Sequence, residues 1–271
     1  MIRWVSLFCS VVFFSSWAIA QDTAAGDAQA RALAAQAMAA LAGSTAVTDV
    51  TLTGTVTRTA GSDVQTGTAT LQATKPGGSL VKLGLTLGER TEVRATQNGL
   101  PQGQWSGPDG AAHSMAGHNV LQEDAAWFFP ALSALAHYAD PNYTFSYVGE
   151  EDREGVQVQR VRVSRPWSLA AKDLGKVPLA PAKLPHPSFD FYLDPSSHLP
   201  VAVAFKVHPD NNMLVDIPAE VRFSDYRAVN GVQTPFHIER WLNGSLLLDL
   251  FVTEAAINSG ISEPALAKEG L

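Results

Sequence analysis

The chain has 271 residues, a formal net charge of −7 and only 17% charged residues. This length suffices for one large domain or two small ones, each with its own core. The acidic balance, without a cluster of Lys and Arg, argues against nucleic acid and anionic membrane surfaces as partners, since both require a basic patch.

The first 20 residues have the pattern of a secretory signal peptide. Arg3 precedes an apolar run from Trp4 to Trp17, and Ala18-Ile19-Ala20 forms a small-residue cleavage site before Gln21. The apolar run is shorter than the roughly 20 residues that a membrane span needs. We therefore predict export to the periplasm with cleavage after Ala20. The single cysteine, Cys9, lies in this segment, so thiol catalysis and thiolate metal sites are not expected in the mature chain.

Asp27 to Leu41 is predicted to form an alanine-rich helix with one apolar stripe, and Gly43 follows as a stop signal. From Val50 onward the apolar period changes to two, which is typical of strands. Strands are expected at 50–56, 67–73, 79–87, 90–97 and 103–105, separated by short turns. Sequential strands joined in this way form an antiparallel meander.

A helical pattern covers Asn119 to Tyr138 and carries a large apolar group, including Trp127 and Phe128. Pro130 lies inside the pattern, which predicts two helical pieces or a kink, with Pro130 near the first turn of the second piece. Burying each large apolar side chain contributes roughly 1.5–3 kcal/mol. This segment is therefore expected to dock on the rest of the molecule.

The second half of the chain is mostly strand, expected at 143–148, 155–163, 188–193, 201–207 and 220–226. A proline-rich stretch at 165–188 predicts a long loop or flap. The chain then ends in a three-stranded meander with Asn230-Gly231 and Asn243-Gly244 as its turns, because Asn-Gly favours the type I′ hairpin turn.

The last strand of this meander, Ser245 to Glu254, is apolar on both faces, whereas an antiparallel sheet usually exposes one face to water. Leu247 and Phe251 share the face that alternation would assign to solvent. We therefore predict an α+β, mainly β fold: one domain over 21–271, built on a strongly curved antiparallel sheet (a half-barrel) with helices covering its concave face. About ten strands are expected, and a sheet of that size tends to curl.

Three motifs add a family resemblance: "VTDVTLTGTVT" after the N-terminal helix, the turn "YLDPSSHLPV", and "FSDYRAVNGVQTPFHIERWLNG" with the closing "INSGISEPAL". Together they resemble the outer-membrane lipoprotein carrier (LolA-like) superfamily of periplasmic proteins. The resemblance implies a half-barrel whose helices close over a hydrophobic cavity that takes acyl chains of lipoproteins or lipids. Arg90, Arg94 and Arg240 are candidates for the cavity arginine of the carriers. The chain departs from the carriers in its greater length and its proline-rich insertion.

Catalytic chemistry is not indicated. The sequence lacks the serine-hydrolase, zinc-protease, P-loop and dinucleotide motifs, so we expect neither an enzyme nor a cofactor. His186, Asp190, Asp194 and His198 would ligate a metal only if a loop folded back. Asp190 and Asp194 share a solvent-facing strand face, and Asp194-Pro195 reads as a turn, so no metal site is expected.

The large aromatic side chains either fill the core or line a ligand cavity. We predict that Trp127, Phe128, Leu132 and Phe251 line such a cavity, with Trp167 on a movable flap. The expected function is a periplasmic carrier or sensor for a lipid-like or acyl-chain ligand. The alternative is a non-catalytic envelope scaffold that has a filled core and binds other envelope proteins. No integral membrane span is expected after removal of the signal peptide.

Overall fold

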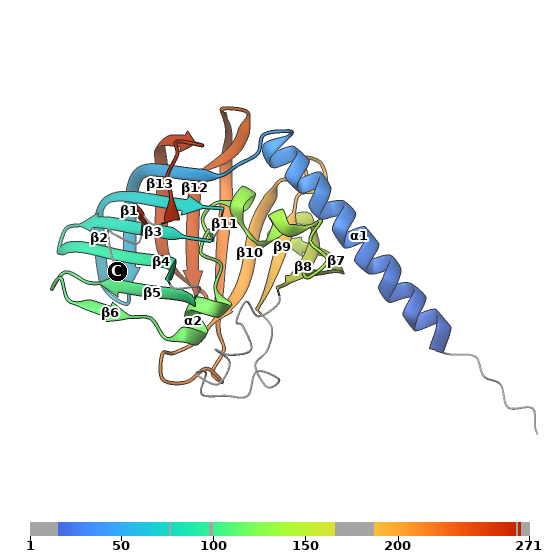
Figure 1. The fold of residues 1–271 in the computed structure, drawn as a ribbon, viewed down its shortest axis with the longest axis horizontal. Helices are drawn as coiled ribbons and strands as arrows, with labels where there is room; N and C mark the ends of the chain where they lie inside the picture. The colour runs from blue at the N-terminus through green and yellow to red at the C-terminus, as the bar shows by residue number, and fades with distance from the viewer. Residues whose placement is uncertain (1–15, 76, 98–99, 166–186, 264, 267–271) are drawn as a thin grey trace, which may run out of the picture.

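The computed structural model describes residues 16–75, 77–97, 100–165, 187–263 and 265–266 (Figure 1). Its strands form one 13-stranded antiparallel sheet, more strands than the sequence predicts. In chain order the strands are β1 (Asp49–Ala60), β2 (Asp63–Thr74), β3 (Ser79–Leu85), β4 (Gly88–Gln97), β5 (Leu100–Ser106), β6 (Ala112–Ser114), β7 (Thr144–Arg153), β8 (Val156–Ser164), β9 (Ser188–Leu193), β10 (Pro200–Val207), β11 (Ile217–Val229), β12 (Val232–Leu242) and β13 (Ser245–Ile257).

All sequential strands are neighbours in the sheet except β6 and β7. The first and last strands, β1 and β13, pair with each other in the middle of the sheet. The strands β6 and β7 are consecutive in sequence but form its two opposite edges. The sheet is strongly curved (Figure 1), so the predicted mainly β fold with a curved antiparallel sheet is confirmed.

The closing meander follows the turn chemistry predicted for Asn-Gly. Asn230 and Gly231 have φ angles of 50° and 81°, and Asn243 and Gly244 have 49° and 76°. Positive φ at both central residues is what the type I′ turn requires. The two turns thus set the register of β11, β12 and β13 next to each hairpin.

Two glycines allow neighbouring strands to approach closely. A Cβ on Gly54 in β1 would lie 2.1 Å from the backbone oxygen of Phe251, and a Cβ on Gly67 in β2 would lie 1.9 Å from that of Gly84. Gly54 also adjoins a register shift between β1 and β13. Glycine in a strand interior commonly marks such a bulge or bend, and here it permits the sheet to curl.

The connection between the two edge strands, residues 115–143, is called here the crossing segment. It contains the helix α2 (Gly117–Gln122) and the 3₁₀ turns η1 (Pro130–Leu132) and η2 (Ala134–His137). Trp127, Phe128 and Phe129 are at most 3% exposed and belong to the main core, so the segment docks as predicted.

The crossing segment is less helical than predicted. Pro130 does begin the second helical piece, but the first piece ends at Gln122. The side chain of Asp124 accepts hydrogen bonds from the backbone amides of Ala126 (3.0 Å) and Ala134 (2.7 Å). These bonds compete with helical hydrogen bonding. They hold the chain in turns over the middle of the concave face.

The N-terminal helix α1 spans Ser16–Ala42, so it begins before the predicted Asp27 and runs through the expected cleavage site. It ends as predicted, because Gly43 has a φ of 55° and its amide donates to the carbonyl of Ala39 at 2.9 Å. The C-terminal half packs on the molecule, while the N-terminal half extends beyond the sheet (Figure 1). Within the described ranges, no helix is both long and apolar enough to cross a membrane.

The prediction that helices cover the second apolar face of β13 is wrong for Phe251. A register shift between Arg240 and Trp241 of β12 inserts an extra residue opposite them, and Leu247 occupies this bulge. Leu248, Leu250 and Val252 then face the core, whereas Phe251 is 51% exposed on the opposite, convex face. Its ring stacks on His237, with centroids 4.3 Å apart and planes 5° apart. A neighbouring side chain, rather than a helix, contacts Phe251.

Candidate binding pocket on the concave face

The concave face carries a pocket of about 200 Å³ beside the crossing segment. We call it the concave pocket. Its apolar wall consists of Val81, Leu83, Trp105, Trp127, Leu247 and Leu248. Its polar wall includes Arg58, Arg90, Glu92 and Arg240. Strands β1, β3, β4, β5, β12 and β13 contribute all of these side chains except Trp127, so strands from the first and last parts of the chain meet there.

The apolar wall is continuous with the main core. Val81, Leu83 and Leu248 are buried members of the core cluster, and Leu247 packs against it. Trp127, in the crossing segment, closes one side of the pocket. Trp105 on β5 is half-buried, and its ring stacks on that of His113 with the ring centroids 4.3 Å apart. The wall therefore offers rigid aromatic and branched aliphatic surface, as small-molecule sites do.

A buried ionic network ties the crossing segment to the sheet next to this pocket. Arg94, 5% exposed, lies 2.7 Å from Glu123 and 3.0 Å from Glu92, and it donates to the carbonyl oxygen of Asn119 at 3.3 Å. Arg240 lies 3.5 Å from Glu123, with its guanidinium 4.6 Å from the centre of the Trp127 ring. Two arginines of the sheet, Arg94 and Arg240, thus contact the crossing segment directly.

The network shifts the pKa values of its members. Burial alone would raise the pKa of Glu92, but the charges of Arg94 and Arg240 and the hydrogen bond from Arg94 outweigh it and hold that pKa below its ordinary value. Burial would lower the pKa of Arg94, and the charges of Glu123 and Glu92 raise it instead. Both groups are therefore charged at neutral pH.

The predicted cavity residues are distributed unevenly. Trp127 lines the concave pocket, whereas Phe128 is fully buried in the core. Leu132 is half-buried and lines a second pocket of about 350 Å³ between the crossing segment and the ends of β4 and β5. Phe251 lies on the convex face, which corrects its prediction as a cavity residue. Trp167 and nearly all of the proline-rich stretch lie outside the described residues.

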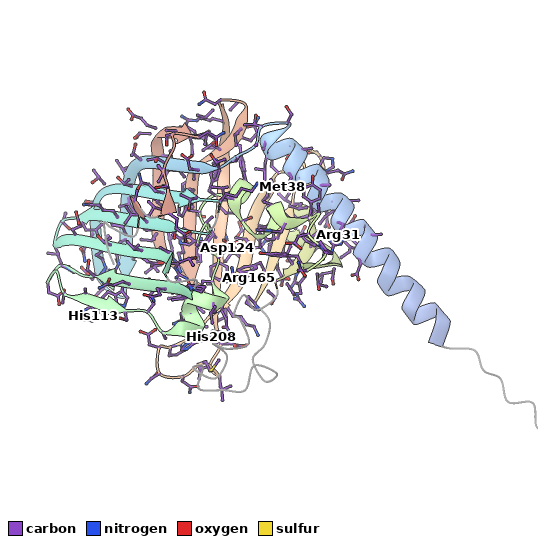
Figure 2. All side chains as sticks on the ribbon, viewed as in Figure 1. Arg31, Met38, His113, Asp124, Arg165 and His208 are labelled. Carbon is purple, nitrogen blue, oxygen red and sulfur yellow. The ribbon has the colours of Figure 1, made fainter. Side chains whose placement is uncertain are left out.

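The space directly under the crossing segment is filled. A cavity of only about 10 Å³ remains between Asp124, Trp127 and the phenylalanines of β9 to β11, which holds no more than a single water. Asp124 lies in front of the middle of the sheet in Figure 2. Ligand space on this face therefore lies beside the crossing segment and not beneath it.

The cationic side chains of the pocket are the part that the sequence analysis missed or left undecided. Arg90, Arg94 and Arg240 all lie on the concave side, two of them in the pocket and Arg94 adjoining it. Arg58 was not considered, although Leu52, Gly54 and Val56 predict the inward face of β1 and Arg58 is the next residue on it. An arginine at an inward position of a period-two pattern is the sequence signal that could have identified Arg58 as a pocket residue.

The residues weighed as metal ligands serve other purposes. Asp190 pairs with Arg160 at 2.6 Å and Arg162 at 2.7 Å on the convex face. Asp194 accepts hydrogen bonds within its own turn, from Ser196 and Ser197. His186 lies outside the described residues.

A different trio lies close together on the convex face: His237, Glu239 and Asp249 have potential ligand atoms within 4.8 Å of one another. The two ring nitrogens of His237 already have partners, since Nε2 lies 2.8 Å from Asp249 and Nδ1 lies 3.0 Å from Ser224. A wider depression of about 570 Å³ elsewhere on that face is likewise lined by paired charges, such as Arg222 with Glu220 at 2.6 Å. Cross-strand pairing accounts for both features.

Comparison with solved structures identifies the architecture. A domain from Vibrio parahaemolyticus named for outer membrane lipoprotein sorting superposes with a TM-score of 0.52, with 90% of this chain and 98% of that chain covered at 10% identity. A LolA superfamily protein from Nitrosomonas europaea superposes with a TM-score of 0.52, with 89% of this chain and 99% of that chain covered at 9% identity. The chain has the LolA fold.

A DUF1329 family protein from Desulfovibrio piger is similar to the same extent, with a TM-score of 0.55, 10% identity, and 89% of this chain and 97% of that chain covered. The resemblance drawn from the sequence motifs to the LolA-like superfamily is thus confirmed at the level of the fold. No protein-family model matches the sequence, and no curated protein matches it. At such low identity the LolA fold says nothing by itself about the ligand.

Proposed function

We propose that the protein is exported to the periplasm, where it binds a lipid-like or acyl-chain ligand in the concave pocket as a carrier or sensor. The observation that carries this proposal is the concave pocket beside the crossing segment, whose apolar wall includes Trp105, Trp127 and Leu247. The LolA fold and the naming of one structural neighbour for lipoprotein sorting add support.

The size of the pocket limits the manner of binding. A volume of about 200 Å³ is below the roughly 300–1,000 Å³ of pockets that enclose a drug-sized ligand. The proposed ligand therefore inserts one apolar end, and the remainder stays outside the pocket.

The filled core under the crossing segment favours a second candidate, a non-catalytic envelope scaffold that binds another protein. Dense packing between the segment and strands β9 to β11 leaves only about 10 Å³ there. The two candidates differ in one respect that is simple to measure: only the first retains a small molecule.

The test is native mass spectrometry of the protein purified without detergent from the envelope of its own host. We expect added mass that organic extraction removes and that identifies the ligand. The variant Trp105→Ala removes half-buried pocket wall and should reduce the bound fraction, whereas Trp241→Ala, on the convex face against Arg222, should not. If repeated preparations show only the mass of the protein itself, and the protein takes up none of the lipids offered to it, the scaffold is the better candidate.

A further inference from the structure

The concave pocket contains more positive charge than the nearby acidic groups balance. Arg58 and Arg90 both line it. Arg58 has one acidic partner, Asp63, at 3.9 Å, and the side chain of Asp63 is 46% exposed. In the described part of the chain, no carboxylate lies within 4.0 Å of Arg90. The positive charges of the two guanidinium groups thus lie in the same pocket with little negative charge nearby to balance them.

The pKa of Arg58 reflects this environment. Burial lowers it first, the charge of Arg90 lowers it further, and Asp63 only partly offsets them, so the pKa falls below its ordinary value. Arg160 and Arg222 show the opposite direction, because their carboxylate partners outweigh the burial. Arg58 is therefore a cation whose surroundings disfavour its charge.

The other acidic groups near the pocket are already engaged. Glu92 pairs with Arg94 at 3.0 Å, and Glu123 lies between Arg94 at 2.7 Å and Arg240 at 3.5 Å. A carboxylate shared between two arginines has little capacity left for a third cation. Neither Glu92 nor Glu123 lies within 4.0 Å of Arg58 or Arg90.

Two further residues of the pocket wall have N–H groups that lack an acceptor. The buried Nε of Arg240 and the buried Nε1 of Trp127 have no hydrogen-bond partner among the described residues. Leaving such a donor unmet in the interior costs about 1–3 kcal/mol. The pocket thus combines unpaired donors, unbalanced cations and an apolar wall.

We propose that the concave pocket recognises an anionic amphiphile, with carboxylate or phosphate oxygens bound by Arg58 and Arg90 and hydrocarbon packed against the apolar wall. This inference rests on the proposed function and specifies its ligand. A guanidinium presents its N–H groups in a planar fork that suits both kinds of oxyanion. A neutral acyl chain would leave the charges of the two arginines unbalanced.

The experiment compares four probes on the purified protein by tryptophan fluorescence and calorimetry, below micellar concentrations: laurate, dodecyl phosphate, dodecanol and inorganic phosphate. We expect both anionic amphiphiles to bind at least about tenfold more tightly than dodecanol, a difference of about 1.4 kcal/mol. The stronger of the two identifies the head group as a carboxylate or a phosphate. Inorganic phosphate alone should bind far more weakly than dodecyl phosphate.

The variants Arg58→Gln, Arg90→Gln and their combination should lose about tenfold or more of the anion affinity while dodecanol binding is unchanged. Arg162→Gln is the matched control, because Arg162 lies on the convex face in an ion pair with Asp190. Circular dichroism and thermal unfolding establish that each variant is folded.

Equal affinity for laurate, dodecyl phosphate and dodecanol would overturn the inference and leave the proposed function standing. A loss of dodecanol binding in step with the anions would also overturn it, as would phosphate binding as tightly as dodecyl phosphate. Failure of all three dodecyl probes to bind would overturn the proposed function with it.

Discussion

Asp194 shows how one carboxylate organises a turn between two strands. Its Oδ1 accepts hydrogen bonds from the amides of Ser196 (2.9 Å) and Ser197 (2.7 Å) and from both of their hydroxyl groups. The Ser196 hydroxyl and the Ser197 amide are the largest contributors, and together these bonds lower the pKa of Asp194 to about 2. The charged form is thus the one that the folded turn favours.

This shift predicts a pH-dependent effect of Asp194→Ala. The ordinary pKa is 3.8 and the folded value is about 2, so the contribution of Asp194 is present in full above the ordinary value. It is lost as the pH falls through about 2. We expect the variant to be about 1–2 kcal/mol less stable at pH 7, and equally stable near the acid limit. Urea unfolding across pH measures this, and a pH-independent difference would contradict it.

At the scale of elements, curvature depends on strands that approach one another at glycine. Gly54 lies at the register shift of the β1–β13 pair, against the backbone of Phe251. Because the neighbouring atoms are backbone, they cannot move aside as a flexible side chain would. The same pair of strands supplies Arg58 and Leu248 to the concave pocket, so the bend also shapes the pocket.

Gly54→Ala should therefore destabilise the protein by about 2 kcal/mol or more, through overpacking between strands. Gly117→Ala is the matched control, because a Cβ there meets no atom within 4 Å. Denaturant unfolding of the two variants provides the comparison. Equal stabilities would show that β1 and β13 can separate without cost, and would contradict the role of Gly54 in the curvature of the sheet.

At the scale of the whole molecule, Arg31 joins three parts of the chain. From α1 (Figure 2), its guanidinium donates to the carbonyl oxygens of Tyr138 at 2.6 Å and Tyr143 at 2.5 Å, at the end of the crossing segment. It also lies 5.0 Å from the centre of the Phe145 ring in β7. One side chain thus connects the helix, the crossing segment and an edge strand.

Arg31→Ala should lower the free energy of unfolding by about 2 kcal/mol or more, since hydrogen bonds to charged groups contribute about 1.5–3 kcal/mol. It should also increase amide hydrogen exchange in α1 and β7. Arg31→Lys retains the charge but not the planar fork, so an intermediate effect is expected. Unchanged exchange in both elements would show that apolar packing alone docks the helix.

Local patterns in the sequence account for most of the fold. Period-two alternation predicts the strands, and the two Asn-Gly pairs set the closing hairpins because their backbone requirement is local. The stop of α1 at Gly43 follows from the same kind of signal. The crossing segment was recognised by its apolar residues, but its turns depend on Asp124 contacting amides up to ten residues away, which helical periodicity does not reveal.

Local sequence signals are therefore enough to predict a mainly β chain of sequential antiparallel strands, an N-terminal helix and an apolar segment that docks on the sheet. Which faces meet depends on contacts between residues far apart in the chain. A bulge opposite Arg240 turns Leu247 toward the concave pocket, and Phe251 lies on the convex face. Arg58 and Arg90 come from β1 and β4 of one sequential meander, whereas pairing of β1 with β13 adds Arg240 and Leu247 from the end of the chain to the same pocket. Long-range pairing of this kind leaves no mark in a local pattern.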